Sequence, residues 1–313
     1  SRSLREIYRD RVSKLSSIDP ETILDRYASV LSGTVSRDDF AAEVLDKGVA
    51  VRKKGNAGRR QDKSEQGETD TRRKEENSDI EAIQKEREEL FTLLEANLYR
   101  MYMFTSCGWF FAELSGLEPV QNIRYALKAI NLLSEYADKD LHETLRSYLV
   151  KAKSNITSFG NGAEIMKQLE AERLPEGVEA ATYFFLKPFF TDEPSEEQYY
   201  GFFELQKFHT EEKGESYVRT FIVLRDTSIE KSFSFRFTGK EEERDGLNIF
   251  VDDLTDDREP FQLELSKLPT ELRNKIGDFL IRSTQRSFSE IAASLFDEVK
   301  EAVTRTAEMA TTP

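Results

Sequence analysis

The period of the hydrophobic pattern changes once along this chain, near Pro175. Before that point apolar residues recur every three or four positions, as at Leu4, Tyr8 and Val12, which is the spacing along one face of an α-helix. Beyond it apolar and polar residues alternate, as in 233–237, which is typical of a strand with one buried face. Helices followed by strands predict an α+β or multidomain chain.

Residues 1–50 are predicted to be helical. Asp19 followed by Pro20 is typical of a helix start, because the Asp side chain caps free amides and proline fits the first turn. Ser36 and Asp39 predict the start of a further helix in the same way.

Residues 51–78 differ in composition from the segments on either side. They carry runs of charge, such as 72–76, and almost no large apolar side chain. Such a segment cannot bury enough surface to offset the entropy lost on ordering. We therefore expect a charged, disordered loop, with a docking or regulatory strip as the alternative.

A helical subdomain is predicted for residues 79–175. Its first helix is expected to start at Ser78, whose spacing to Glu81 matches a capping box. Pro119 opens another helix at the favoured first position. The Phe-Gly-Asn-Gly run at 159–162 predicts a turn before the last helix of this part.

Residues 176–313 are predicted to form a β-rich subdomain closed by two helices. The pattern in 180–190 fits either a helix or a strand, and the aromatic residues of 199–203 fit either a sheet core or a carbohydrate-binding face. The closing helices are expected at 270–281 and from Ser287 onward. Five strands are expected in an antiparallel sheet or small sandwich, at 199–208, 217–224, 233–237, 247–251 and 261–265.

The net charge and the cysteine content limit the classes of partner and the cellular compartment that we expect for this chain. The net charge of −14 over 313 residues repels phosphate backbones, so no nucleic acid partner is expected, whereas neutral glycans do not feel this field. No apolar run approaches the length of a membrane span, so no membrane partner is expected. Cys107 is the single cysteine, which rules out an intrachain disulfide and fits a cytoplasmic location.

The sequence lacks the common motifs of catalysis and cofactor binding. It has no glycine-rich phosphate loop and no G-x-S-x-G nucleophile elbow. The two histidines, His142 and His209, lie far apart in sequence and offer no zinc ligand set with Cys107. No cofactor, no metal and no catalytic residue are therefore predicted, and whether the chain is itself an enzyme stays open.

The segment 101–126 is unusual because the only tryptophan lies two residues from the only cysteine and begins a run of three aromatic residues. One interpretation is a helix end packed in a core, with Cys107 buried as a small hydrophobe. The other is a ligand wall, in which Trp109 stacks on the apolar face of a sugar and Glu113, Glu118 and Gln121 bind its hydroxyls.

Two blocks of sequence resemble a known family. The first runs Tyr-Met-Phe-Thr-Ser-Cys-Gly-Trp-Phe-Phe over 102–111, continues as Glu-Leu-Ser-Gly-Leu-Glu over 113–118, and includes Gln121 and 124–126. The second is Ala-Lys-Ser-Asn-Ile at 152–156, followed by the turn at 160–162. Both resemble a domain of unknown function that follows the catalytic barrel in proteins similar to glycoside hydrolase family 57, which are often labelled alpha-amylase or alpha-mannosidase.

The resemblance is specific over roughly residues 85–170 and covers the rest only in outline. It implies an accessory, non-catalytic C-terminal region whose partners are the catalytic barrel of the same polypeptide and an oligo- or polysaccharide. Arg124 and Asn155, which lie in the two blocks, complete the candidate substrate-binding set of Trp109, Glu113, Glu118 and Gln121.

This chain also departs from the family pattern. The loop at 51–78 looks like an insertion, and nothing matches the catalytic Glu, the acid Asp or the His-rich strand motif that the family carries on its barrel. No catalytic residue is therefore transferred to this sequence. A structural or protein-interaction module without carbohydrate contact is the main alternative, and an activity from a site of a new kind is a third.

Overall fold

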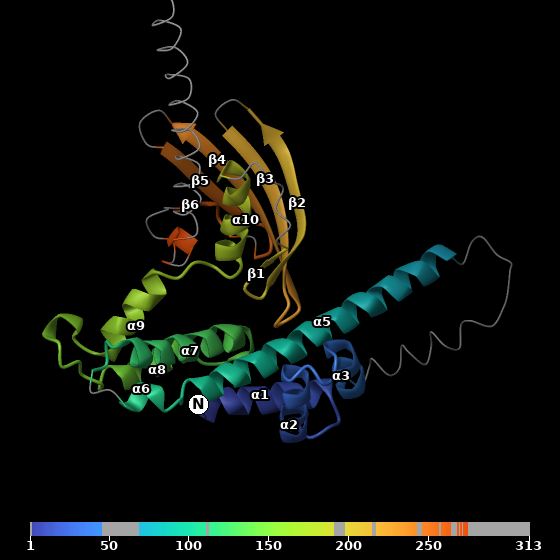
Figure 1. The fold of residues 1–313 in the computed structure, drawn as a ribbon. Helices are drawn as coiled ribbons and strands as arrows, with labels where there is room; N and C mark the ends of the chain where they lie inside the picture. Colours follow the sequence, from blue (N-terminus) through green and yellow to red (C-terminus); the bar gives the residue numbers. More distant parts are fainter. Residues whose placement is uncertain are drawn as a thin grey trace, which may run out of the picture. The chain divides into compact units, whose positions relative to one another are not determined.

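A computed structural model gives the fold of the chain (Figure 1). It describes residues 2–45, 69–110, 113–190, 198–214, 217–242, 246–256, 258–263, 268, 270 and 272–274, with the side chains at 69–77, 109, 110, 189, 190, 241, 242, 246 and 247 excepted. The chain forms two compact units. The first comprises 1–173 and the turn 227–231, and the second comprises 174–226 and 232–313.

The first unit is helical, as predicted. The predicted caps of its second and third helices are confirmed, because Asp19 accepts a hydrogen bond from the Thr22 amide at 3.0 Å and Ser36 accepts one from the Asp39 amide at 3.1 Å. The α-helices are α1 (Arg2–Leu15), α2 (Pro20–Leu31), α3 (Arg37–Val44), α5 (Thr69–Tyr102), α6 (Cys107–Phe110), α7 (Leu117–Leu133), α8 (Leu141–Leu149) and α9 (Gly162–Ala171), with short 3-10 turns at Ser134–Tyr136 and Thr157–Phe159.

Helix α5 supplies much of the core of this unit. Leu90, Phe91, Leu93, Leu94 and Ala96 are completely buried, and α5 packs against α1 and α7 (Figure 1). The Phe91 ring also lies 6.2–6.4 Å from two other buried aromatic rings, on α2 and α3. One helix thus organises four others.

The start of α5 differs from the predicted start. The helix begins at Thr69, well before the capping box expected at Ser78. Residues 69–78 are rich in Arg, Lys and Glu, which have high helix propensity even without a buried face. The end of the charged segment therefore continues the helix, while its residues 51–68 lie outside the described part of the chain.

The second unit is an antiparallel sheet with one helix packed against it, as the fold class predicted. The helix is α10 (Val178–Phe190), and the strand order follows the sequence, β1-β2-β3-β4-β5-β6. Buried side chains of α10 and of one sheet face form a single cluster, which includes Phe185, Phe235 and Phe237. The strands are β1 (Tyr199–Tyr200), β2 (Phe203–Lys213), β3 (Tyr217–Asp226), β4 (Lys231–Glu242), β5 (Gly246–Asp253) and β6 (Phe261–Leu263).

The segments 180–190 and 199–203 each allowed two interpretations from the sequence, and the structure distinguishes between them. Residues 180–190 are helical, and the apolar side chains of 180, 181 and 183–186 belong to the buried cluster shared with the sheet. The strand expected at 199–208 is split by a turn at Gly201, whose φ of +58° suits glycine. Of the aromatic residues there, Tyr200 and Phe203 pack against the core, while Tyr199 and Phe202 are exposed. Residues 270 and 272–274 are helical, and the remainder of the two predicted closing helices lies outside the described residues.

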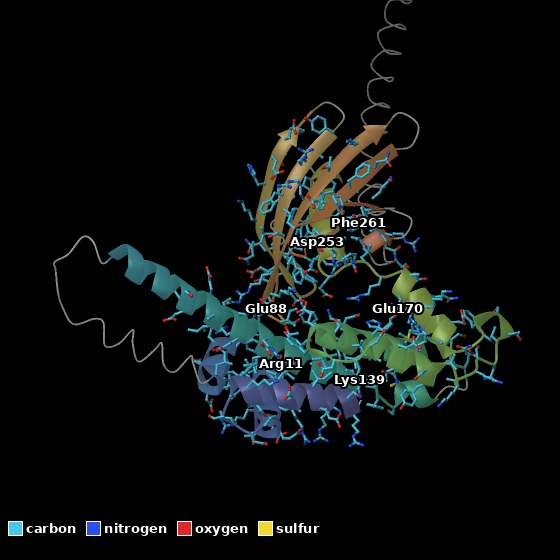
Figure 2. All side chains as sticks on the ribbon, turned by 180° about the vertical axis from the view of Figure 1, so that it is seen from behind. Arg11, Glu88, Lys139, Glu170, Asp253 and Phe261 are labelled. Carbon is cyan, nitrogen blue, oxygen red and sulfur yellow. The ribbon has the colours of Figure 1, made fainter. Side chains whose placement is uncertain are left out.

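A buried ion pair lies in the helical unit. Arg87 of α5 donates to both carboxylate oxygens of Glu230, at 2.8–3.0 Å, and Glu230 is only 3% exposed. Arg37 donates to the Ser228 carbonyl at 2.7 Å and stacks on the Phe91 ring at 4.6 Å. The turn 227–231 is held by these two guanidinium groups. Arg11, labelled in Figure 2, makes a second pair to α5, 2.6 Å from Glu89.

We predict that Arg87→Met lowers the free energy of unfolding by about 3–5 kcal/mol, because the buried carboxylate of Glu230 would lose the guanidinium of Arg87. Urea denaturation followed by circular dichroism measures the change. Adding Glu230→Gln should recover part of the loss by removing the buried negative charge. The control is Arg2→Met, which breaks the exposed Arg2–Glu6 pair and should cost under about 1 kcal/mol. Equal costs for the two arginine variants would contradict the prediction.

Candidate functional site

The two sequence blocks that resemble the family meet at one carboxylate. Glu113 lies between α6 and α7, and its Oε1 accepts hydrogen bonds from the Ser115 amide and hydroxyl, both at 2.9 Å, and from the Ser154 hydroxyl at 2.6 Å. Its Oε2 accepts from the Asn155 amide at 2.9 Å. Glu113 therefore ties the loop before α7 to the loop after α8. We call Glu113, Ser115, Ser154 and Asn155 the Glu113 cluster.

These hydrogen bonds change the acidity of the carboxyl group. Donation by Ser154, then by Ser115 and Asn155, favours the ionised form and lowers the pKa of Glu113 to about 2. A carboxylate with so low a pKa stays charged near neutral pH and is a poor proton donor or base. Its role in this arrangement is to hold the two loops together.

The second block is a closed turn built around Gly160. The Ser154 amide donates to the Gly160 carbonyl at 3.0 Å, and the Gly162 amide donates to the Ala152 carbonyl at 2.9 Å. Gly160 has a φ of +65°, a conformation that favours glycine. Asn161 then caps α9 by accepting from the Ala163 amide at 2.9 Å. The predicted turn is confirmed, and it fixes the two groups that bind Glu113.

Gly108 explains part of the first block. A Cβ atom at this position would lie 2.1 Å from Nδ2 of Asn122 on α7. That amide donates to the Thr105 carbonyl at 3.2 Å, and its oxygen accepts from the Thr105 hydroxyl at 2.8 Å. Glycine thus lets α6 lie against α7 while Asn122 holds the segment before it. Asn122 and Thr105 were not among the predicted residues, because nothing in the sequence shows that 105 and 122 meet.

The end of α5 joins this region through aromatic contacts. The Tyr102 ring lies 5.5 Å from the Tyr125 ring of α7, and both lie 6.0 Å from the Tyr99 ring. Offset and edge-on ring pairs at these distances are favourable. Tyr102, Tyr125 and Gly108 of the first block are therefore explained by packing within the chain.

The other predicted binding residues are less engaged. Glu118, Gln121 and Arg124 lie on α7 at successive three-residue steps, and none makes a hydrogen bond or ion pair to the described residues. Arg124 is exposed, and the other two are half-buried. The structure brings Glu113 and Asn155 into direct contact, through the hydrogen bond from the Asn155 amide. The backbone of Trp109 lies on α6, and its side chain is outside the described residues.

Cys107 and His142 lie on the short helix α6 and on α8, respectively. Cys107 is exposed, so the prediction of a buried small hydrophobe was wrong. It begins the short helix α6, where the close approach is made by Gly108 instead. His142 of α8 lies with its Nδ1 2.8 Å from Oε1 of Glu170, which is labelled on α9 in Figure 2. Within the described ranges, no three or more His, Cys, Asp and Glu side chains form a group suited to a metal ion.

One known family matches most of this chain. The family described as a domain of unknown function, DUF3536, matches residues 62–297. The chain belongs to the DUF3536 family. The match includes α5, the Glu113 cluster, α7 and all six strands, whereas α1, α2 and α3 precede it. No curated protein and no solved structure is significantly similar to this DUF3536 chain. Over the described part of the chain, none of its helices has the length and apolar character needed to cross a membrane.

We predict that Glu113→Gln lowers the thermal midpoint of this DUF3536 chain at neutral pH and that the difference from wild type fades in acid. The folded pKa of about 2 lies below the ordinary value of 4.5. The stabilisation by the carboxylate is therefore present above pH 4.5 and is lost as the pH falls toward 2. Melting curves of both proteins across this window test the idea.

The matched control is Glu164→Gln, because Glu164 is exposed on the neighbouring helix α9. Its midpoint should follow the wild-type midpoint at every pH. A constant difference between Glu113→Gln and wild type from pH 7 to pH 2 would show that the charge of Glu113 is not what holds the loops.

Proposed function

We propose that this chain is an accessory, non-catalytic C-terminal region of a glycoside hydrolase family 57-like or glucan-transferring protein, and that it packs on the catalytic barrel and helps form the saccharide site. The observation that carries the proposal is the Glu113 cluster, which joins the two blocks resembling that family's accessory domain. Membership of DUF3536 supports a shared domain and leaves its activity open. No nucleic acid or membrane partner belongs to this proposal, and the single cysteine favours a cytoplasmic location.

The polar side of the site is on α7. Glu118, Gln121 and Arg124 retain their hydrogen-bonding groups for a ligand, since none is used within the described residues. A carboxylate, an amide and a guanidinium are suited to sugar hydroxyls, and Trp109 would offer an apolar face to the ring. Glu113 and Asn155 position this surface in our proposal, because the bonds between them are already made.

The apolar side of the site is next to the same cluster. Leu117 is 80% exposed at the start of α7, and Ile156 and Phe159 are exposed in the turn that follows Asn155. Leu117 lies two residues from Ser115 and Ile156 directly follows Asn155, so these exposed apolar side chains border the Glu113 cluster along the chain and are candidates for a surface that another domain covers. In our proposal these three side chains contact the barrel.

The same exposed apolar side chains favour a second candidate function. A structural or protein-interaction module would also bury Leu117, Ile156 and Phe159 against a partner, with no carbohydrate involved. Both oxygens of the Glu113 carboxylate already accept hydrogen bonds within the chain, which fits this alternative equally well. The two candidates differ in what α7 contacts, and glycan binding separates them.

We predict that malto-oligosaccharides or mannans change the fluorescence of this chain in a saturable way. Trp109 is its only tryptophan, so the signal has one origin. Gln121→Ala and Glu118→Gln should each weaken the apparent affinity by roughly three- to tenfold, because each removes a hydrogen bond to the ligand. Fluorescence titration with the intact chain measures both.

The control is Glu164→Gln, which should bind as wild type does. Affinities that respond equally to all three substitutions would point to a nonspecific effect. If no glycan changes the fluorescence, the same titration is repeated with the barrel protein present. No glycan response and no association with the barrel would reject the proposal, whereas association without a glycan response would favour the interaction module.

A further inference from the structure

Two arginine side chains of α1 share one carboxylate of α2. Glu21 of α2 accepts hydrogen bonds from Arg5 at 3.0 and 3.3 Å and from Arg9 at 2.8 Å. The charges of Arg5 and Glu21 both act on Arg100 of α5. The three guanidinium groups outnumber the one carboxylate that Arg5 and Arg9 share, which leaves an excess of positive charge. We call Arg5, Arg9, Glu21, Asn97 and Arg100 the Arg100 cluster.

Arg100 has no anionic partner in the described part of the chain. Its Nε donates to Oδ1 of Asn97 at 2.6 Å, a neutral acceptor on the same helix. Arg100 is half-buried, and burial, followed by the positive charge of Arg5, lowers its pKa, while Glu21 opposes this. A guanidinium stays protonated in proteins and is costly to desolvate without an anion. Its two Nη groups therefore have unused donors.

Asn97 provides a second, independent sign of an absent acceptor. The residue is 2% exposed, and its Nδ2 is a buried donor with no hydrogen-bond partner among the described residues. Buried polar atoms are nearly always bonded, so such an atom calls for an explanation. The amide that carries it lies against Arg100, one helical turn away. The Nη groups of Arg100 and the Nδ2 of Asn97 thus have no acceptor among the described residues.

The local charge opposes that of the whole chain. The chain carries a net charge of −14, which by itself would discourage anions. Helix α1 nevertheless has five basic residues against two acidic ones, which gives 5 − 2 = +3. These residues are Arg2, Arg5, Arg9, Arg11 and Lys14 against Glu6 and Asp10. Glu21 and Glu89, which pair with Arg5, Arg9 and Arg11 from outside α1, reduce this excess to 3 − 2 = +1, and Arg100 adds one more positive charge.

We infer that Arg5 and Arg100, with Arg100 held in place by Asn97, form a binding site for an oxyanion, namely the phosphate or carboxylate group of a ligand. Arginine binds such groups well because its planar donors match two oxygen atoms at once. A neutral sugar would leave the positive charge of Arg100 unpaired. This site is distinct from the Glu113 cluster and does not depend on the proposed saccharide function.

The test is the binding of inorganic phosphate to the intact chain, measured by calorimetry at constant ionic strength set with chloride. Saturable binding is expected for the wild type. Arg100→Gln should weaken it by at least about tenfold, because a charged hydrogen bond is lost. Arg5→Gln gives a second variant on an exposed side chain, which keeps the test valid if Arg100→Gln does not fold.

The matched control is Arg26→Gln, since Arg26 is an exposed arginine of the same unit that pairs with Glu43. It should bind phosphate as the wild type does. Acetate and glucose 1-phosphate, titrated in parallel, show whether a carboxylate or a phosphate ester is preferred, and binding of either supports the site. No binding of phosphate, acetate or glucose 1-phosphate above the chloride background, or an equal loss in Arg26→Gln, would overturn the inference without bearing on glycan binding at α7.

Discussion

The burial of one face of α5 is the constraint on which the helical unit depends. Leu90, Leu93 and Leu94 are fully enclosed, and helices α1 and α7 pack on the same helix. Because a helix is rigid over its length, the side chains that it carries outside the core have fixed spacing. This one helix places Arg87, which makes the buried ion pair, and Tyr102, which makes the aromatic contact. It also places Asn97 and Arg100, whose remaining donors have no acceptor among the described residues.

The Glu113 cluster applies a different kind of constraint, through charge rather than apolar contact. One carboxylate satisfies donors from two loops that are separated by α7 and α8. Such an arrangement fixes a surface without needing a large core, which suits a region where apolar side chains remain exposed. Of the residues that suggested a sugar site, Glu113 and Asn155 thus hold the surface, while the side chains of Glu118, Gln121 and Arg124 make no hydrogen bond to the described residues.

Much of the fold could be predicted from the sequence, because hydrophobic period and capping chemistry are local. The change of period separates the helical unit from the sheet, although α10 lies beyond Pro175 and is helical, and the caps at Asp19 and Ser36 were located by residue. The start of α5 was missed because helix propensity continued without an apolar pattern. Contacts between residues far apart in the sequence could not be predicted from these local patterns. No local rule links Glu113 to Ser154, or shows that Cys107 faces solvent while Gly108 makes the close contact.

The backbone of Glu230 has a consequence for how this family can vary. Its φ of +59° lies in the left-handed region, where glycine is usually found and other residues are strained by about 1 kcal/mol or more. The buried carboxylate of Glu230, which binds Arg87, is a physical reason for glutamate at this position. At position 230 the backbone strain of the turn is thus offset by the ion pair with Arg87. Relatives that replace Arg87 lose the reason to keep an acid at 230, so the two positions should covary, with glycine or asparagine appearing at the turn wherever the arginine is absent.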